Sequence, residues 1–363
     1  MSILPRWSLG LCALAVLFFA SLKVQTPPLA DERIALPTSQ LDDVDHWLLL
    51  LNNPLENEVI ARIQASAHDM VVVDFLASIK GMEQVDMRGI IARLRDRGPG
   101  RAPRLVIAYM NAGQAEDYRT YWRDGWRPGA PDYIISDDPD GWAGNFPVAY
   151  WDPRWQSVLM GDGGLIDNIA EAGFDGLYLD WIGGYEFEPV VARARRDHVD
   201  PADAMETLVA RISARMKAQR SGAIIIAQNA PALWQRDGFL AAIDAVVQEH
   251  TWFAGTDDNA MLGDCPLPRT EAEAAGSADY LARLPPLCLK DWRDNPGSSL
   301  RYESEAYLLP LFARAQRAGK VVFTVDYALD RRNVGWIAQE SRSHGFVPFV
   351  GARPLTDYVE PLP

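Results

Sequence analysis

Two carboxylates stand at the ends of apolar runs, where a buried strand would deliver them to the edge of a sheet. Asp180 closes the segment GFDGLYLD and Glu249 closes the segment AVVQE. Two carboxyl groups about 5–5.5 Å apart suit double displacement at a sugar carbon, with one as nucleophile and one as acid/base. A gap of about 6.5–9.5 Å would leave room for an activated water and give inversion. Asp180 and Glu249 are therefore the candidate catalytic residues, with both stereochemical outcomes open.

Two further acids, Asp74 and Asp326, end other apolar runs in the same way. Next to the catalytic pair they would raise the pKa of a general acid by charge repulsion, or hold sugar hydroxyls or a substrate ammonium. The structural alternative is that they pair with arginines of the same domain or cap the helices that follow. We expect both to contact substrate.

Neutral polar and aromatic residues complete the expected binding surface. Amide and phenol groups bind hydroxyls, and indole rings stack on sugar rings; loop support and core packing are the alternatives. The candidates are Tyr109, Asn111, Tyr150, Asn229, Trp181 and Trp252.

Several other catalytic classes lack their motifs. The five histidines are scattered, without an H-E-x-x-H spacing, so we expect no metal and no cofactor. No G-x-S-x-G elbow is present, which excludes the common serine-hydrolase route, and no phosphate-binding loop is found. His250 follows Glu249 directly, and strand alternation should turn it away from the site to pack behind the strand.

Eight apolar, β-branched-rich runs recur along the chain, most of them separated by an amphipathic stretch. Continuous apolar runs are typical of parallel strands buried on both faces, and eight strand–helix repeats predict a single-domain α/β (β/α)₈ barrel. A doubly wound open sheet is the alternative, but no G-x-G-x-x-G follows the first run. The expected strands are 46–51, 70–75, 104–110, 176–181, 223–229, 245–250, 321–327 and 346–351. The expected helices include 87–97, 155–172, 202–220, 303–318 and 334–344.

Two long connections, residues 113–152 and 252–299, follow the third and sixth expected strands. They are rich in Trp, Pro, Gly and Asp, and we expect them to form loops over the carboxyl mouth of the barrel.

The first residues have the pattern of a secretory signal. Arg6 precedes the apolar run 9–20, which is short for a membrane span of about 20 residues. We expect a signal peptide over 1–25, an exit segment over 26–44, the barrel over 45–352 and a tail over 353–363. The protein would be secreted or periplasmic, with an uncleaved N-terminal anchor as the alternative.

Cysteine usage agrees with export, and the net charge bears on the partner. Without the signal, Cys265 and Cys288 remain as an even pair in a Pro-rich segment, and such a pair in an oxidising compartment predicts a disulfide. The formal net charge of −14 argues against a nucleic-acid partner, which needs a basic surface, and suits a neutral or cationic ligand. No obligate protein partner is evident.

Taken in order, several segments resemble glycoside hydrolase family 114, the endo-α-1,4-polygalactosaminidase-like barrels. The resemblance covers about residues 47–351 and is carried by Asn52-Asn53, VVVDF, AYMNAG, VAYWDP, GFDGLYLD, AQN and the strand of Glu249. It implies that Asp180 is the nucleophile and Glu249 the general acid/base.

The resemblance also implies a function and a partner. The protein would be an extracytoplasmic, endo-acting, retaining glycoside hydrolase that cleaves an α-linked amino-sugar polysaccharide. A non-catalytic carbohydrate-binding barrel that tethers or guides an exopolysaccharide is the alternative. The segment that bears the two cysteines departs from the family pattern and leaves the sugar itself open.

Overall fold

The computed structural model describes residues 40–255, 264–301 and 303–362, and the barrel lies within the unit Thr38–Pro363. The expected signal peptide and most of the expected exit segment lie outside the described residues. Among the helices that the structure describes, none is long and apolar enough to cross a membrane.

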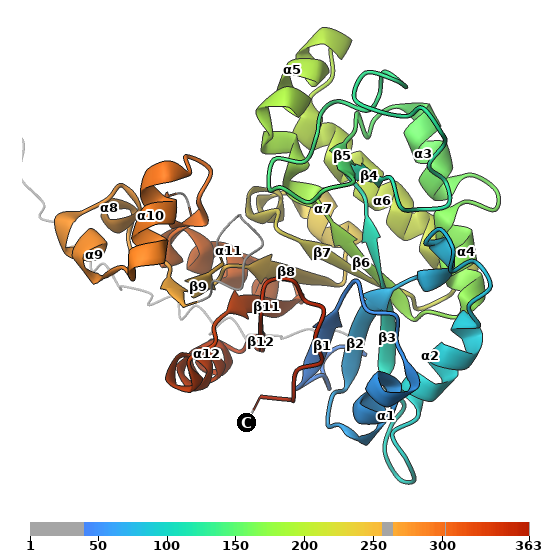
Figure 1. Cartoon of the computed structure of the whole chain (residues 1–363), viewed down its shortest axis with the longest axis horizontal. Helices are drawn as coiled ribbons and strands as arrows, with labels where there is room; N and C mark the ends of the chain where they lie inside the picture. The colour runs from blue at the N-terminus through green and yellow to red at the C-terminus, as the bar shows by residue number, and fades with distance from the viewer. Residues whose placement is uncertain (1–39, 256–263, 302, 363) are drawn as a thin grey trace, which may run out of the picture. The chain divides into compact units, whose positions relative to one another are not determined.

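Eight parallel strands form one sheet in the order β1-β2-β3-β6-β7-β8-β11-β12 (Figure 1). At the seam, the indole of Trp47 donates to the carbonyl of Val347 at 3.1 Å, and the amide of Leu51 donates to the carbonyl of Leu355 at 2.8 Å. The predicted (β/α)₈ barrel is confirmed, with all eight strands where they were expected. The strands are β1 Trp47–Leu50, β2 Met70–Asp74, β3 Leu105–Asn111, β6 Gly176–Asp180, β7 Ile224–Gln228, β8 Ala245–Glu249, β11 Val321–Tyr327 and β12 Val347–Gly351.

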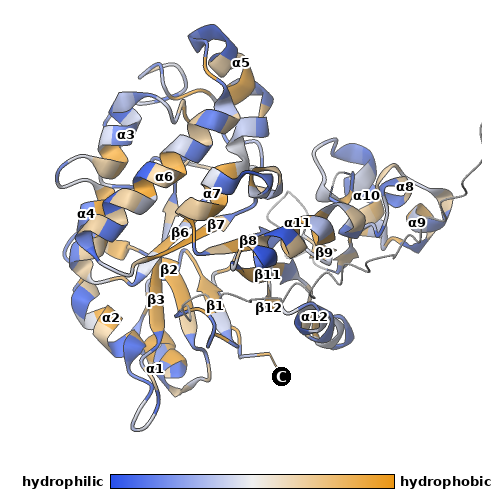
Figure 2. Cartoon of the chain, turned by 180° about the vertical axis from the view of Figure 1, so that it is seen from behind, coloured by the Kyte–Doolittle hydropathy of each residue, from blue (hydrophilic) through white to orange (hydrophobic). Residues whose placement is uncertain are grey.

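The strands are apolar along their length, while the helices carry polar residues on their outer faces (Figure 2). Val71, Val72 and Val73 of β2 are all completely buried, as expected for a strand covered on both faces. The helices are α1 Asn57–Ala65, α2 Met87–Arg95, α3 Pro153–Met160, α4 Leu165–Ala172, α5 Glu188–Asp197, α6 Pro201–Gln219, α7 Asp237–Ala242, α8 Glu271–Ala274, α9 Ala278–Arg283, α10 Pro286–Asp294, α11 Glu305–Arg317 and α12 Arg331–Ser343.

The helix expected over 155–172 is two helices, α3 and α4, and that prediction was wrong. The break is the run Gly161-Asp162-Gly163-Gly164. Gly163 has a φ of 70°, and a Cβ on Gly161 would lie 2.5 Å from the carbonyl oxygen of Ser157. Apolar residues at helical spacing lie on both sides of this run, which is why one helix was expected. The backbone turns at the run, and the turn needs glycine.

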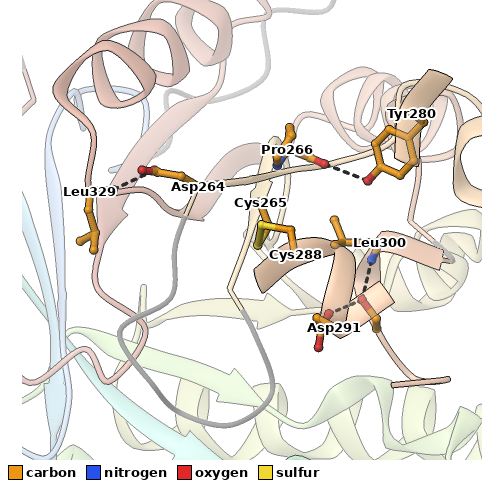
Figure 3. The surroundings of a disulfide bond; sticks show 9 residues. Asp264, Cys265, Pro266, Tyr280, Cys288, Asp291, Leu300 and Leu329 are labelled. Atoms are coloured by element: carbon orange, nitrogen blue, oxygen red, sulfur yellow. Dashed lines mark hydrogen bonds between the residues drawn. A yellow bond between two sulfur atoms is a disulfide. The ribbon is translucent and has the colours of Figure 1, made fainter. Parts of the chain in front are cut away.

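The two long connections carry their own short elements. The first contains the antiparallel pair β4 Gln114–Glu116 and β5 Asn145–Pro147. The second contains β9 Phe253–Ala254, β10 Cys265–Pro266 and the helices α8, α9 and α10. The predicted disulfide is present: it joins Cys265 on β10 to Cys288 on α10, with Cα atoms 5.3 Å apart (Figure 3).

We expect the disulfide to contribute to stability. It closes a segment with a sequence separation of 23 residues, for which the chain-entropy model gives about 3 kcal/mol. The double variant Cys265→Ser/Cys288→Ser should lose about that much free energy of unfolding in urea. Reductant should destabilise the wild type and leave the double variant unchanged. Two titratable thiols in the folded protein purified without reductant would contradict the pairing.

Candidate active site

A cavity of about 560 Å³ lies at the carboxyl ends of the barrel strands. Both candidate catalytic residues line it, Asp180 from the end of β6 and Glu249 from the end of β8. Active sites of (β/α)₈ barrels lie at this face. Four of the predicted binding residues also line the cavity: Asp74, Tyr109, Trp181 and Asn229.

Asp180 is held by one donor on each carboxylate oxygen. The hydroxyl of Tyr109, on the neighbouring strand β3, donates to Oδ2 at 2.5 Å. The main-chain amide of Trp181 donates to Oδ1 at 2.6 Å. The carboxylate is therefore fixed in orientation by its own strand end and by the next strand.

Glu249 receives hydrogen bonds from two neighbouring strands. From the β7 side, the amides of Gln228 and Asn229 donate to Oε2 at 2.5 and 2.7 Å. From β11, the hydroxyl of Tyr327 donates to Oε1. Asn229 also accepts from the main-chain amide of Glu249 at 2.8 Å, so one side chain holds both the backbone and the carboxylate of Glu249.

Burial, followed by the negative charge of Glu249, raises the pKa of Asp180 to about 7, and the bonds from Tyr109 and Trp181 only partly offset this. The negative charge of Glu249 therefore acts on Asp180 across the cavity that both residues line. The sequence did not predict the raised pKa of Asp180.

The residue after each of three adjacent strands has a left-handed backbone. Trp181 follows β6 with a φ of 59°, Asn229 follows β7 with a φ of 51°, and His250 follows β8 with a φ of 55°. Residues other than glycine adopt this conformation at a cost and mostly where the surroundings impose it. Here all three line the cavity.

This turn corrects the prediction for His250, which was expected behind the strand. Strand alternation does not extend past Glu249, because the left-handed residue breaks the period-two pattern. His250 lines the cavity, and its Nδ1 lies 2.7 Å from the hydroxyl of Ser299. Burial lowers the pKa of His250 to about 4, so the imidazole is neutral at neutral pH.

Trp181 lines the cavity as predicted, and two glycines make its position possible. A Cβ on Gly113 would lie 2.5 Å from the main-chain oxygen of Trp181, and a Cβ on Gly184 would lie 2.3 Å from its ring. The ring of Phe187 packs edge-on against the indole at 5.8 Å. The indole is thereby fixed in the cavity wall.

Asp74 lines the cavity, but both of its carboxylate oxygens already have partners. Arg119 donates to Oδ1 at 2.9 Å, and the main-chain amide of Asn52 donates to Oδ2 at 2.8 Å. Arg119 also pairs with Glu116 at 2.8 Å, and all three ionic side chains are buried. The structure therefore shows the alternative that was considered for Asp74, pairing with an arginine.

The structure places Asn111 and Tyr150 away from the cavity lining. Asn111 closes a turn with Gln114: its Oδ1 accepts from the Gln114 main-chain amide at 2.8 Å, and its Nδ2 donates to the side-chain oxygen at 2.9 Å. The hydroxyl of Tyr150 donates to the carbonyl of Pro201 at 2.6 Å, and the ring is completely buried. Both residues hold loops, which corrects their expected placement.

Trp252 and Asp326 also lie outside the cavity lining, and they bind each other. The carboxylate of Asp326 accepts from the main-chain amides of Trp252 at 2.6 Å and Phe253 at 2.9 Å. The indole of Trp252 donates to the hydroxyl of Ser341 on α12 at 2.8 Å. Since Tyr327 lines the cavity, strand alternation turns its neighbour Asp326 away from it.

The sequence missed several cavity residues, most of which come from the loops. In the first loop, a run of aspartates was the sequence signal that could have identified cavity residues. Burial, followed by the charge of Asp140, raises the pKa of one of them, Asp138, to about 6. Gln228 lies in the AQN segment that carries the family resemblance, and the other positions had no signal in the sequence. The missed residues include Gln114, Asp138, Asp140, Trp142, Asn145, Gln228, Gln248, Gly297, Ser299, Glu303, Tyr327 and Arg353.

The sequence of this chain is similar to a family model and to proteins of other organisms. The model of glycoside-hydrolase family GH114 matches residues 47–363. An uncharacterized protein of Deinococcus radiodurans is 31% identical over 334 residues, which cover 91% of this chain and 88% of that protein. An uncharacterized protein of Thermotoga maritima is 28% identical over 304 residues, which cover 80% of this chain and 84% of that protein.

Two solved structures share the fold. The glycoside hydrolase domain of PelA from Pseudomonas aeruginosa superposes with a TM-score of 0.54 at 16% identity, covering 86% of this chain and 97% of that one. Ega3 of Aspergillus fumigatus, solved in complex with galactosamine, superposes with a TM-score of 0.55 at 14% identity, covering 90% of this chain and 99% of that one.

Proposed function

The chain belongs to glycoside-hydrolase family GH114, and from this premise we propose that it hydrolyses an α-linked amino-sugar polysaccharide with Asp180 as nucleophile and Glu249 as general acid/base. The observation that carries the proposal is the placement of both carboxylates, from β6 and β8, in the wall of one cavity.

The proposed reaction is a double displacement. Asp180 attacks the anomeric carbon while Glu249 gives its proton to the departing glycosidic oxygen, so that the old C–O bond breaks as the ester to Asp180 forms. Glu249 then takes a proton from water, which attacks the same carbon and releases Asp180. The donors from Tyr109 and Trp181 orient the nucleophile, and those from Gln228 and Asn229 orient the acid/base.

The charge of the cavity supports a cationic sugar. Leaving out Asp74, whose charge Arg119 balances, the acids among the described residues that line it are Asp138, Asp140, Asp180, Glu249 and Glu303, against one arginine, Arg353. Clefts lined by one sign of charge raise the local concentration of oppositely charged ligands. Galactosamine bound to the structural neighbour Ega3 agrees with such a substrate.

We also propose that the enzyme acts outside the cytoplasm and cleaves within the polymer. The signal-like N-terminus supports export, and a disulfide is the expected state of a cysteine pair in an oxidising compartment. The family resemblance supports endo action.

The test is the release of reducing ends from a panel of polysaccharides that includes de-N-acetylated α-1,4-galactosamine polymer. The proposal predicts release of oligosaccharides by the wild type and none by Asp180→Asn. Binding of the polymer without release by either protein would instead identify a carbohydrate-binding barrel.

We expect the acidic limb of the pH profile of kcat/KM to report Asp180. A nucleophile must be ionised, so activity should rise as the pH rises through about 7, the pKa of Asp180. Glu249→Gln removes the negative charge that raises this pKa, so the limb should move to lower pH. An aryl glycoside with a good leaving group makes the measurement possible, because it needs little proton donation.

The matched control is Asp237→Asn, which removes an exposed charge that pairs with Arg314 at the surface. Asp237→Asn should leave the pH at which kcat/KM rises unchanged. A limb that stays in place in Glu249→Gln, or moves to higher pH, would contradict the coupling between the two carboxyl groups.

A further inference from the structure

The two carboxylate oxygens of Glu249 have different surroundings. Oε2 accepts from Nε2 of Gln228 at 2.5 Å and from Nδ2 of Asn229 at 2.7 Å. Oε1 accepts from the hydroxyl of Tyr327, at the end of β11. Since Gln228 ends β7 and Asn229 follows it, the side chain is held from both strands that neighbour β8. One oxygen therefore faces two amides and the other faces a phenol.

The amide of Asn229 cannot turn round to accept a hydrogen bond from Glu249. Its Oδ1 accepts from the main-chain N–H of Glu249 at 2.8 Å, and a main-chain N–H can only donate. The NH2 group of Asn229 must therefore face Oε2, and the NH2 group of Gln228 faces the same oxygen. Two donors fill the two lone-pair directions of Oε2, so a proton on this oxygen would displace one of them.

The hydroxyl of Tyr327 leaves Oε1 able to carry the proton, because one donor occupies only one of the two lone-pair directions. Tyr327 is 2% exposed and lines the same cavity as Glu249. Burial, followed by the negative charge of Glu249, raises the pKa of Tyr327 well above its ordinary value. The phenol therefore keeps its own proton and remains a donor to Oε1.

We propose that Glu249 delivers its proton from Oε1, and that Tyr327 is the positioning residue that stabilises the carboxylate left behind. The inference rests on the proposed role of Glu249 as general acid/base and adds the atom from which the proton leaves. As the O–H bond at Oε1 breaks, a new O–H bond forms at the glycosidic oxygen, and the electron pair stays on Oε1. The hydrogen bond from Tyr327 strengthens at that moment, because a charged acceptor binds a donor more strongly than a neutral one.

Other titratable and charged groups are in electrostatic contact with Glu249 or Tyr327. Tyr327→Phe removes one oxygen and no charge, so these groups act alike in the wild type and in the variant. A difference between the two proteins therefore reports the hydroxyl of Tyr327. The groups are Asp140 before β5, Tyr178 and Asp180 on β6, His250 after β8, Glu303 before α11 and Arg353 after β12.

Titration of the Glu249 carboxyl group tests the proposal without a substrate. Glutamate labelled with ¹³C in its side-chain carboxyl gives NMR signals that follow protonation, and Glu249→Gln identifies the signal of Glu249. In Tyr327→Phe this signal should titrate about one pH unit or more above the wild type, because the ionised form loses a hydrogen bond. The matched control is Tyr150→Phe, which removes a buried hydroxyl that donates to the carbonyl of Pro201. It should leave the titration unchanged.

Kinetics on aryl glycosides with graded leaving groups test the same hydroxyl in catalysis. In Tyr327→Phe, kcat/KM should fall by up to about tenfold on the poorest leaving group and approach the wild type on the best, which needs little proton donation. The basic limb of the pH profile reports loss of the proton from the general acid, and it should move to higher pH. Tyr109→Phe removes the corresponding hydroxyl from Asp180 and should move the acidic limb to higher pH instead.

A carboxyl titration and a basic limb that both stay in place in Tyr327→Phe would overturn the inference, since a residue that only packs there would change stability and neither of these. Should Tyr327→Phe fail to fold, replacement of Tyr327 by 3-fluorotyrosine gives a stronger donor of similar shape. It should move both to lower pH, and no movement would again overturn the inference. Failure of the wild type to hydrolyse any amino-sugar substrate would count against the proposed function, while the carboxyl titration would still decide the effect of Tyr327 on Glu249.

Discussion

Asp180→Asn lowers kcat/KM on an amino-sugar oligosaccharide by about three orders of magnitude or more, with the fold intact, because it removes the attacking charge while keeping the shape of the side chain. Asparagine keeps one oxygen that accepts from the main-chain amide of Trp181, and its NH2 group then faces the hydroxyl of Tyr109, which can turn to accept, so the melting temperature should change little. Steady-state kinetics and thermal unfolding measure the two effects. Asp237→Asn, at the surface, should retain full activity, and a folded Asp180→Asn protein that did the same would refute the assignment.

Glu249→Gln separates the acid/base from the nucleophile. Loss of general acid catalysis costs about 10²–10⁴-fold on a natural leaving group and much less on an activated aryl glycoside. Azide then distinguishes the two variants by stereochemistry. In Glu249→Gln it attacks the glycosyl-enzyme and gives the product of net retention, whereas in Asp180→Asn it takes the place of the nucleophile and gives the inverted azide. The same azide product from both variants would contradict the division of roles.

Arg119→Met lowers the free energy of unfolding by about 3–5 kcal/mol, because it leaves two buried carboxylates without their counter-charge. Arg119 is 2% exposed and pairs with Asp74 at 2.9 Å and Glu116 at 2.8 Å. Urea unfolding measures the loss. Since Asp74 lines the cavity, the substitution also disturbs the substrate-facing wall.

Arg154→Met is the matched control for Arg119→Met. Arg154 also pairs with two carboxylates, those of Asp132 and Asp152, but its side chain is 54% exposed. Exposed ion pairs contribute about 0–1 kcal/mol, so this variant should unfold close to the wild type. Equal losses in the two variants would show that burial of the Arg119 cluster does not set its contribution.

The barrel could be predicted because its signal is repeated: eight apolar runs, most of them separated by an amphipathic stretch, leave few other arrangements. The catalytic pair could be predicted for a related reason, since Asp180 and Glu249 end their strands and strand ends meet at one face. Asp326 stands near the end of a similar run but faces away, because β11 extends one residue further to Tyr327. A strand that is one residue longer turns its last acidic side chain from the cavity to the opposite face. The apolar pattern does not define strand length to one residue.

The remaining site residues depend on the backbone and on contacts between distant segments. The left-handed backbone at His250 reverses the direction that strand alternation predicts, and histidine itself gives no sign of it. Glu303 lies 55 residues from Gln248 in the sequence and was expected within a helix, so only the folded chain brings the two together.

The central claim, that Asp180 attacks the sugar, is tested most directly by trapping the glycosyl-enzyme. An activated fluoro-sugar substrate that forms the ester quickly and hydrolyses it slowly should add one glycosyl unit to the wild type. Digestion and mass spectrometry should then find that mass on the peptide that contains Asp180. An adduct on Glu249, or hydrolysis with inversion and no adduct at all, would contradict the account.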